Sequence, residues 1–238
     1  MNLSKLLENT AERIPQHIGL RFEGKSYTFY ELNRIVSRMA NGLMAAGLKR
    51  GDKCILMMQS NPRFITTYYA LAKMGAIIIP VNFLYKVHEL SHIFQDSGAK
   101  GFIGMEPYLE EPRKVLADLP DLSIRIALGV REGTGFIPLE KIDGPDTCET
   151  YTAEDDDTLA ILYTSGTTGP PKGAMLTHKN LYSNAMTVAD MRENEPDDVV
   201  IGVLPLYHIF GQTSALNASI YRGLTFHLFR QFEAKEVI

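Results

Sequence analysis

The stretch TLAILYTSGTTGPPKG, residues 158–173, combines two features that decide how this chain folds. Its first half, from Thr158 to Tyr163, is a largely apolar run of the length of a buried strand. Its second half packs hydroxyls, glycines and one lysine into a turn. That turn cannot be helical, because Pro170 and Pro171 restrict the backbone and lack an amide hydrogen. A strand that leads into such a turn suits the binding of a phosphate group.

The same alternation of apolar runs and helical segments continues along the chain from about residue 50. It predicts an α/β fold with mostly parallel sheets flanked by helices, because runs that are apolar throughout are typical of strands covered on both faces. The predicted strands are KCILMMQ, AIIIPVN, KGFIG, SIRIALG, TLAILYTS, DVVIGVLP and LTFHLF. The predicted helices cover residues 62–74, 87–95, 108–117 and 177–191, a segment near His208, and the final FEAKEVI. The N-terminal MNLSKLLENTAERIP also has amphipathic helical spacing.

Composition places the chain among ordinary globular proteins, with 45% apolar and 22% charged residues and a formal net charge of −4. The charged residues form no block of one sign, so nothing in the charge pattern suggests a nucleic-acid partner. Cys54 and Cys148 fit neither a disulfide framework nor a cysteine-type zinc site, so two buried structural thiols in a reducing compartment are expected. With no export signal and no apolar run of membrane-spanning length, the sequence predicts a cytoplasmic protein whose membrane contact is at most peripheral.

The turn after Tyr163 has the chemistry to hold a polyphosphate. Glycines let backbone amides approach oxygens closely, Thr164, Ser165, Thr167 and Thr168 add hydroxyl donors, and Lys172 adds a positive charge. It is not the usual P-loop, because Pro171 precedes the lysine and Gly173 follows where Ser or Thr would bind magnesium.

YTSGTTGPPKG resembles the phosphate-binding signature of the adenylate-forming enzymes, which include acyl-CoA synthetases, aryl-CoA ligases, luciferases and the adenylation domains of peptide synthetases. Further segments fall in the order that this family shows. They are YTFYELN (residues 27–33), LAKMGAIIIPVN (71–82), DSGAK (96–100) and LPLYHIFG (204–211). The resemblance therefore spans nearly the whole chain and implies the N-terminal region of the adenylate-forming fold.

The resemblance implies a two-step ligase that uses ATP, Mg²⁺, a carboxylic acid and coenzyme A. It assigns the triphosphate to Thr164, Ser165, Gly166, Thr167, Thr168, Gly169 and Lys172. It gives His208 a catalytic place at the border between adenylate and acyl pocket, and makes His208, Phe210 and Gly211 the substrate-binding residues. The wording HIFGQ resembles fatty-acid and aryl-acid CoA ligases more than amino-acid-activating domains. No metal ligand is expected from the chain itself.

Later motifs of this family are missing after Gly211: an aromatic-Gly-x-Thr-Glu segment, a Thr-Gly-Asp segment and a C-terminal lysine. The expectation is therefore half of an active site, inactive alone. By the same resemblance, residues 51–195 form a first α/β subdomain, and residues 1–50 with 196–238 form an incomplete second one. The apolar strands of this second part predict a homo-oligomer, since open sheet edges invite pairing.

Two other functions stay open at this stage. HELSH, from His88 to His92, matches the HExxH helix of zinc hydrolases, with Glu89 as the base, but it lacks the extension that would need Gly at Gln95 and His at Gly98. The chain could also be a non-catalytic nucleotide-binding module that has the phosphate loop without the other motifs.

Overall fold

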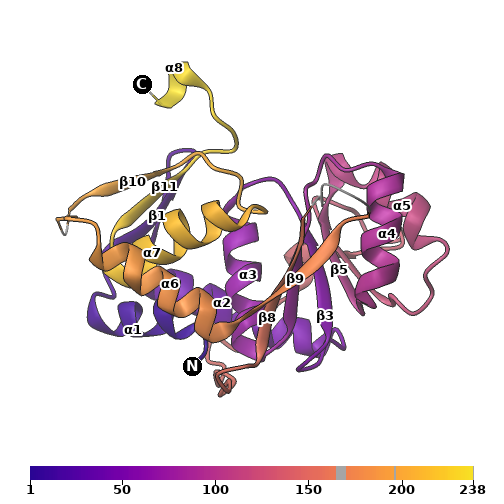
Figure 1. Cartoon of the computed structure of the whole chain (residues 1–238), viewed down its shortest axis with the longest axis horizontal. Coiled ribbons are helices and arrows are strands. Elements are labelled where there is room, and N and C mark those ends of the chain that lie inside the picture. Colours follow the sequence, from indigo (N-terminus) through magenta and orange to yellow (C-terminus); the bar gives the residue numbers. More distant parts are fainter. Residues whose placement is uncertain (165–169, 196, 238) are drawn as a thin grey trace.

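Two β-sheets organise the chain in the computed structural model, which describes residues 1–164, 170–195 and 197–237. The larger sheet has the strand order β7-β6-β5-β3-β4-β8-β9, and the smaller one the order β10-β11-β1-β2 (Figure 1). The strands are β1 (Ile18–Phe22), β2 (Lys25–Thr28), β3 (Lys53–Met57), β4 (Ile77–Pro80), β5 (Gly101–Met105), β6 (Ile124–Leu128), β7 (Ile137–Pro138), β8 (Thr158–Thr164), β9 (Lys172–Thr177), β10 (Val199–Gly202) and β11 (Thr225–Leu228).

Helices connect most of these strands. They are α1 (Lys5–Arg13), α2 (Phe29–Ala45), α3 (Pro62–Met74), α4 (Val87–Ser97), α5 (Glu110–Leu116), α6 (His178–Asp190), α7 (Ala218–Arg222) and α8 (Ala234–Val237), with 3₁₀ turns at Glu106–Tyr108 and Leu139–Lys141 and a π-helical stretch, η3, at Gly211–Asn217. Local chemistry explains α3. The Asn61 side chain caps its first amides, Pro62 opens it, and Gly75 ends it at φ 77°.

The larger sheet is mostly parallel, as predicted from its apolar runs. Its strands β3, β4, β5, β6, β7 and β8 pair in parallel, and only β9 runs antiparallel, against β8. Strand β9 was not predicted. The segment from Lys172 to Thr177 is short and mostly exposed, so its extended backbone depends on pairing with β8 and not on an apolar pattern of its own.

Helices cover both faces of the larger sheet. Leu56 and Ile78 belong to one apolar cluster together with residues of α2 and α3, whereas Ile55 and Ile79 belong to a second cluster with residues of α4 and α5. This follows from the alternation of side chains along a strand, which sends neighbouring residues to opposite faces. The result is a doubly wound α/β layer.

The smaller sheet joins the two ends of the chain. Strand β1 pairs in parallel with β11, with Leu20 opposite Phe226, and β11 pairs in parallel with β10. The subdomain boundaries expected at residues 50/51 and 195/196 stay a prediction, since one apolar cluster contains both Leu56 of the larger sheet and Phe226 of the smaller one.

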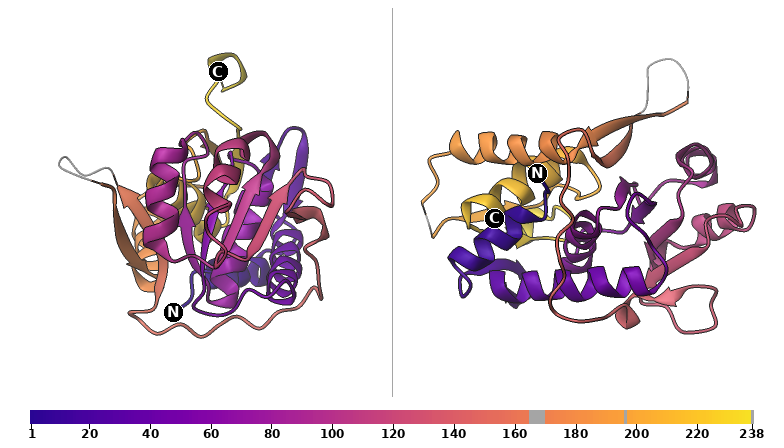
Figure 2. Two further views of the ribbon diagram at one scale, coloured as in Figure 1. Left: turned by 90° about the vertical axis from the view of Figure 1, so that its right-hand side faces the viewer. Right: turned by 90° about the horizontal axis from the view of Figure 1, so that it is seen from below.

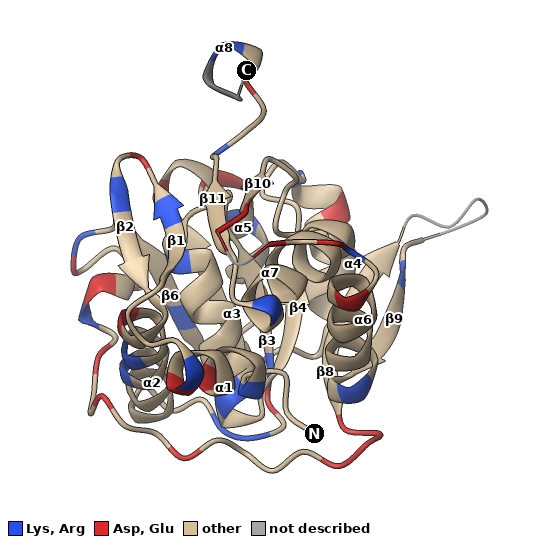
Figure 3. Ribbon diagram, turned by 90° about the vertical axis from the view of Figure 1, so that its left-hand side faces the viewer, with Lys and Arg blue, Asp and Glu red and all other residues tan. Residues whose placement is uncertain are grey.

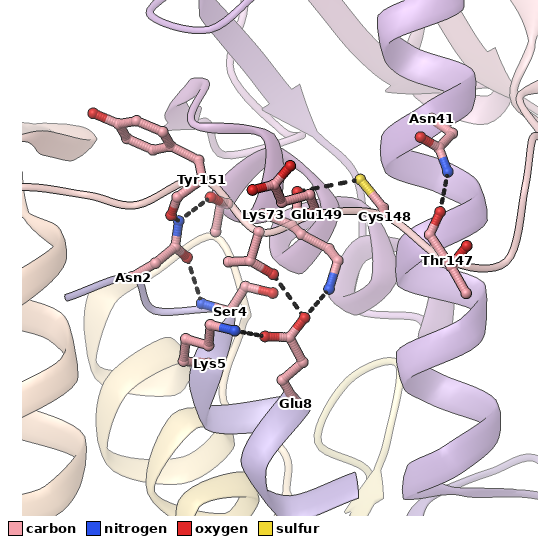
Figure 4. Close-up of polar contacts among 12 residues, drawn as sticks. Asn2, Ser4, Lys5, Glu8, Asn41, Lys73, Thr147, Cys148, Glu149 and Tyr151 are labelled. Carbon is pink, nitrogen blue, oxygen red and sulfur yellow. Dashed lines mark hydrogen bonds and ion pairs between the residues drawn. The ribbon is translucent and has the colours of Figure 1, made fainter. Parts of the chain in front are cut away.

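A polar cluster at the N-terminus ties α1 to the rest of the molecule (Figure 4). The Asn2 amide donates to the carbonyl oxygens of Ala72 and Tyr151, at 2.8 and 2.9 Å. Glu8 pairs with Lys73, whose side chain is 1% exposed, and accepts a hydrogen bond from Thr150 at 2.7 Å. Burial alone would raise the pKa of Glu8, but hydrogen bonds from Lys5, Lys73 and Thr150 outweigh it and hold that pKa below its usual value.

The stretch between β7 and β8 runs along α2 as a strap. Arg34 and Arg38 of α2 form ion pairs with Asp146 and Asp143, and the Asn41 amide donates to two carbonyl oxygens of the strap. Figure 3 shows the resulting mixture of positive and negative segments around α1 and α2. Exposed pairs of this kind contribute little stability each. Apolar packing adds to them, because Ile142 of the strap is buried in the same cluster as Val36 and Met39 of α2.

The two cysteines differ in burial. Cys54 is fully buried, as expected, but the expectation is wrong for Cys148, which is half-buried on the strap. Burial raises the pKa of both thiols. Within residues 1–164, 170–195 and 197–237, no helix has the length and apolar character to cross a membrane.

Candidate functional site

The carboxyl ends of β3, β4 and β8 lie at one edge of the larger sheet, because these strands are parallel. Ser60 follows β3, Phe83 follows β4 and Thr164 ends β8. In α/β sheets, ligands bind at this edge, in the crevice outside the carboxyl ends of the strands. The predicted phosphate loop therefore starts where the fold favours a ligand.

Thr164 and Lys172 form a directly opposed pair on β8 and β9. Both are exposed, and the hairpin that carries them reaches out from the body of the larger sheet (Figure 2). The structure thus brings the first and last predicted phosphate-binding residues together. The predicted residues between them, Ser165, Gly166, Thr167, Thr168 and Gly169, lie outside the described residues.

Gly173 has a packing role that the sequence interpretation missed. A Cβ atom at this position would lie 2.7 Å from Cγ2 of Ile161 and 3.4 Å from the ring of Tyr163, which faces it across the hairpin. A glycine is therefore needed here for the close approach of two strands, whatever binds to the loop.

Helix α4 contacts the hairpin beside the loop. The Tyr163 hydroxyl donates to Oδ2 of Asp96 at 2.6 Å, and Nε2 of His92 lies 2.7 Å from the carbonyl oxygen of Pro171. A carbonyl can only accept, so Nε2 carries the hydrogen. Burial, and then the hydrogen bond to Asp96, raise the pKa of Tyr163.

The HELSH motif does not assemble a metal site in the part of the chain that the structure describes. His88 is exposed, whereas His92 is half-buried and spends Nε2 on Pro171. No group of three or more His, Cys, Asp or Glu residues there is placed to hold a metal ion. The pattern matches because two histidines fall one turn apart on α4, and one of them serves the hairpin.

The segment LPLYHIFG lies against the same sheet edge. The Leu206 amide donates to Oγ of Ser60 at 3.1 Å, and the Gln212 side chain donates to the Leu206 carbonyl at 2.7 Å. The ring of Tyr207 meets that of Phe83 edge-on, with 5.7 Å between centroids. These contacts fix the segment to the ends of β3 and β4, and thereby place His208 on the side of the molecule where β8 also ends.

His208 and Phe210 are exposed, Phe210 by 54%, while Gly211 is buried. The Phe210 amide donates to Nδ1 of His208 at 3.3 Å, so the proton of the neutral ring is on Nε2, where it can be donated. A Cβ atom at Gly211 would lie 2.6 Å from the carbonyl oxygen of Pro205, which explains the glycine by backbone contact alone.

A cavity of about 510 Å³ lies elsewhere. It opens between the β1–β2 hairpin, α2 and the start of α3, next to Met105 and Leu128 at the ends of β5 and β6. The residues around it include Arg63 and Arg230, but not Thr164, Lys172, His208, Phe210 or Gly211. The predicted site is thus an open sheet edge and not this cavity.

Several neighbours of the site were missed from sequence. Ser60, Phe83, His92 and Asp96 support it, and two of them could have been found, because Ser60 and Phe83 directly follow predicted parallel strands. His92 and Asp96 carry no such local signal, since their contacts join residues 79 and 67 positions apart.

With this fold and this loop, the chain belongs to the AMP-binding enzyme family, whose sequence profile matches residues 7–238. Among curated relatives, a feruloyl-CoA synthase from an Amycolatopsis species is 32% identical over 228 residues, 96% of this chain and 44% of that protein. A crotonobetaine/carnitine–CoA ligase from Citrobacter koseri is 31% identical over 249 aligned positions, which cover 98% of this chain and 47% of that protein. A long-chain-fatty-acid–CoA ligase from Bacillus subtilis is 28% identical over 269 residues, 99% and 47%. The chain spans about half the length of these relatives.

Solved structures share the fold. The ATP-bound MatB of Rhodopseudomonas palustris matches with a TM-score of 0.87 and 29% identity, over 100% of this chain and 47% of that one. The anthranilate CoA ligase AuaEII in complex with anthranoyl-AMP matches with a TM-score of 0.93 and 24% identity, over 100% and 47%. Because AuaEII is only 24% identical to this chain, its similarity concerns the fold alone.

Proposed function

We propose that this chain is the N-terminal part of an ATP-dependent acyl-CoA synthetase. The observation that carries the proposal is the juxtaposition of Thr164 and Lys172 at the sheet edge against which the His208 segment also packs. Two further facts support it. The chain belongs to the AMP-binding family, and the relatives named above are CoA ligases or a CoA synthase.

The proposed reaction has two steps. A carboxylate oxygen attacks the α-phosphorus of ATP, the bond to the bridging oxygen breaks, and pyrophosphate leaves with that electron pair. The thiolate of coenzyme A then attacks the acyl carbonyl carbon, and AMP leaves. Positive charge and hydrogen-bond donors near the β- and γ-phosphates favour the first step, because they stabilise the negative charge that moves onto pyrophosphate.

Lys172 is the residue to which we assign that charge, and Thr164 a hydroxyl donor at the other end of the loop. We extend the site to Ser165, Gly166, Thr167, Thr168 and Gly169 on the sequence signature alone. Mg²⁺ would enter with the ATP phosphates. Since the described residues hold no cluster of carboxylates or histidines suited to a metal ion, we assign it no ligand in this chain.

His208, Phe210 and Gly211 are proposed to border the acyl group. Nε2 of His208 can donate toward an adenylate, and the exposed ring of Phe210 offers an apolar contact to an aryl or alkyl chain. The proposal names an aryl or fatty carboxylic acid, because the HIFGQ segment resembles ligases for such acids and two of the named relatives are a feruloyl-CoA synthase and a long-chain-fatty-acid–CoA ligase. The crotonobetaine/carnitine–CoA ligase lies outside this class.

We further propose that the 238-residue chain binds ATP but does not form acyl-adenylate at a useful rate by itself. The support is the chain's coverage of 44–47% of its relatives, together with the importance of positioning in such catalysis. A non-catalytic nucleotide-binding module would bind in the same way, and only the exchange activity of a longer form of the protein separates the two functions.

Calorimetric titration with ATP tests the assignment of the loop. We expect millimolar binding, weakened about 10-fold or more in Lys172→Ala, because a hydrogen bond to a charged group contributes about 1.5–3 kcal/mol. Lys100→Ala is the matched control. Lys100 is exposed and directly precedes β5, so it lies at the amino-terminal ends of the parallel strands, away from the proposed site. Equal losses in both variants, or no ATP binding by the parent chain, would contradict the assignment.

Labelled pyrophosphate exchange tests the second half of the proposal. We expect exchange into ATP at the level of a no-protein control for a panel of aryl and fatty acids. Carboxylate-dependent exchange well above that level would show that the chain is active alone.

A further inference from the structure

Helix α4 is hydrogen-bonded to both ends of the phosphate loop. His92 reaches the carbonyl oxygen of Pro171, the residue before Lys172, at 2.7 Å. Asp96 accepts from the hydroxyl of Tyr163, the residue before Thr164, at 2.6 Å. Residues 92 and 96 are four positions apart on a helix and therefore share one face. One face of α4 thus contacts the chain both before the loop, at Tyr163 of β8, and after it, at Pro171.

Packing makes these two contacts a single arrangement. The rings of His92 and Tyr163 meet edge-to-face, with 6.2 Å between their centroids. Gly173 leaves the room in which the Tyr163 ring lies against the opposite strand. Behind this face, Ile93 and Phe94 of α4 are buried in the same apolar cluster as Ile161 of β8, so the helix itself cannot shift easily.

Groups that are held in place before a ligand binds lose less conformational entropy on binding. Thr164 and Lys172 are both exposed, and their side chains take no part in the contacts with α4. One hydrogen bond therefore holds the backbone at Pro171, and the other holds the Tyr163 side chain. Both leave the side chains of Thr164 and Lys172 to the ligand.

We propose that His92 and Asp96 are positioning residues that fix the two ends of the phosphate loop for ATP. The identity of the ligand rests on the proposed function, whereas the tether itself rests on the contacts of α4. The inference also gives the second histidine of HELSH a role that involves no metal.

Two readouts test the tether. The first is the rate of tryptic cleavage after Lys172, followed by mass spectrometry, which reports how freely the hairpin opens without any ligand. The second is the dissociation constant for ATP. The variants are His92→Leu, which removes the donor, His92→Gln, which keeps an amide donor, and Tyr163→Phe, which removes the hydroxyl at the other end. His88→Leu is the matched control, an exposed histidine one turn earlier on the same helix.

We expect His92→Leu and Tyr163→Phe to be cleaved about 3- to 10-fold faster after Lys172 and to bind ATP about 3- to 10-fold more weakly, the range that one lost hydrogen bond gives. His92→Gln should recover most of both values, and His88→Leu should match the parent chain. Urea unfolding of each variant verifies that it is folded. If His92→Leu does not fold, Tyr163→Phe still tests the tether.

Each other result overturns part of the inference. If His92→Leu and Tyr163→Phe are both cleaved at the rate of the parent chain, there is no tether. Faster cleavage with unchanged ATP affinity means that the contacts are structural and do not position the loop. If the parent chain itself fails to bind ATP, the proposed function fails, and the cleavage rates alone decide whether α4 holds the hairpin.

Discussion

The two sheets of this molecule differ in how completely their strands are covered. At the centre of the larger sheet, neighbouring residues Ile55 and Leu56 are both fully buried, because helices pack on both faces. On β10, at the edge of the smaller sheet, Val199 and Ile201 are 41% and 50% exposed. The same kind of apolar run therefore builds a core in one sheet and leaves an open surface in the other.

This difference bears on the proposed site, which takes residues from both regions. The hairpin with Thr164 and Lys172 belongs to the covered sheet, and the segment with His208 follows β10 of the open one. A covered sheet provides fixed supports, such as α4 beside the loop. The open one presents side chains, such as Phe210, to whatever lies beyond it.

The largest expected effect comes from truncating the same residue type in each sheet. Ile79→Ala on β4, where the side chain is fully buried, should lower the free energy of unfolding by about 4 kcal/mol, from lost burial and the cavity that remains. Ile201→Ala on β10 should cost within about 0.5 kcal/mol, as for an exposed position. Urea unfolding of both variants measures the contrast, and similar losses would break the comparison.

The next effect concerns the N-terminal polar cluster that anchors α1 on α3. Glu8→Ala leaves the buried Lys73 ammonium without its carboxylate and should cost about 3 kcal/mol. Because the pKa of Glu8 is lowered in the folded chain, its contribution is complete above the ordinary pKa and is lost as pH falls through the lower folded value. Glu110→Ala, which removes an exposed pair with Lys114, is the control and should change little.

A third effect is a pH dependence of the stability, caused by His178. This residue is the first of α6, the helix that follows β9 and packs on α7. The buried ring accepts from the Leu3 amide at 3.1 Å, and burial lowers its pKa to about 4. Between about pH 6.5 and 4 the unfolded chain binds a proton that the folded chain does not, so stability should fall by about 2 kcal/mol as pH drops through this window.

His178→Asn should remove most of this slope, and His88→Asn, at an exposed position, should keep it. The measurement is the urea midpoint at several pH values between 4.5 and 7.5 for the parent chain and both variants. An unchanged slope in His178→Asn would mean that the ring does not stay neutral in the folded chain.

How far the sequence predicted these features depended on the range of the contacts behind them. The strands at Lys53–Met57 and Ile77–Pro80 and the helix at Pro62–Met74 were predicted from apolar runs and helical spacing, which are local signals. The structure shows that local chemistry also fixes the ends of this helix, through Asn61, Pro62 and Gly75. Strands β1, β2 and β9 have mixed patterns and depend on pairing partners, so they were missed. Local pattern reading is blind to stabilisation that comes from distant chain segments.

The candidate site shows the same division. The signature assigned Thr164 and Lys172 to one phosphate site, and the structure places them opposite each other on β8 and β9. Their binding of phosphate stays a prediction. The helix behind them was predicted over residues 87–95, but its histidines entered the sequence interpretation only as a zinc motif. Its actual contacts, between His92 and Pro171 and between Asp96 and Tyr163, bridge segments that no short pattern links.

The smallest expected effect concerns self-association, which stays a prediction. The exposed apolar side chains of Val199 and Ile201 lie on an edge strand, and such edges pair readily with a second copy. Ile201→Lys should therefore raise the dimer dissociation constant about 10-fold, which corresponds to about 1.4 kcal/mol. Light scattering and sedimentation of freshly purified protein over a range of concentrations measure it.

Met175→Lys sharpens this last test, because Met175 is 66% exposed on β9, one of the two edge strands of the larger sheet. If the open surface of the smaller sheet is the interface, Ile201→Lys weakens the dimer and Met175→Lys leaves it unchanged. The reverse result would move the interface to the β8–β9 hairpin, where, under the proposed function, a second copy would compete with ATP. A parent chain that stays monomeric at all concentrations would show that Val199 and Ile201 tolerate water without a partner.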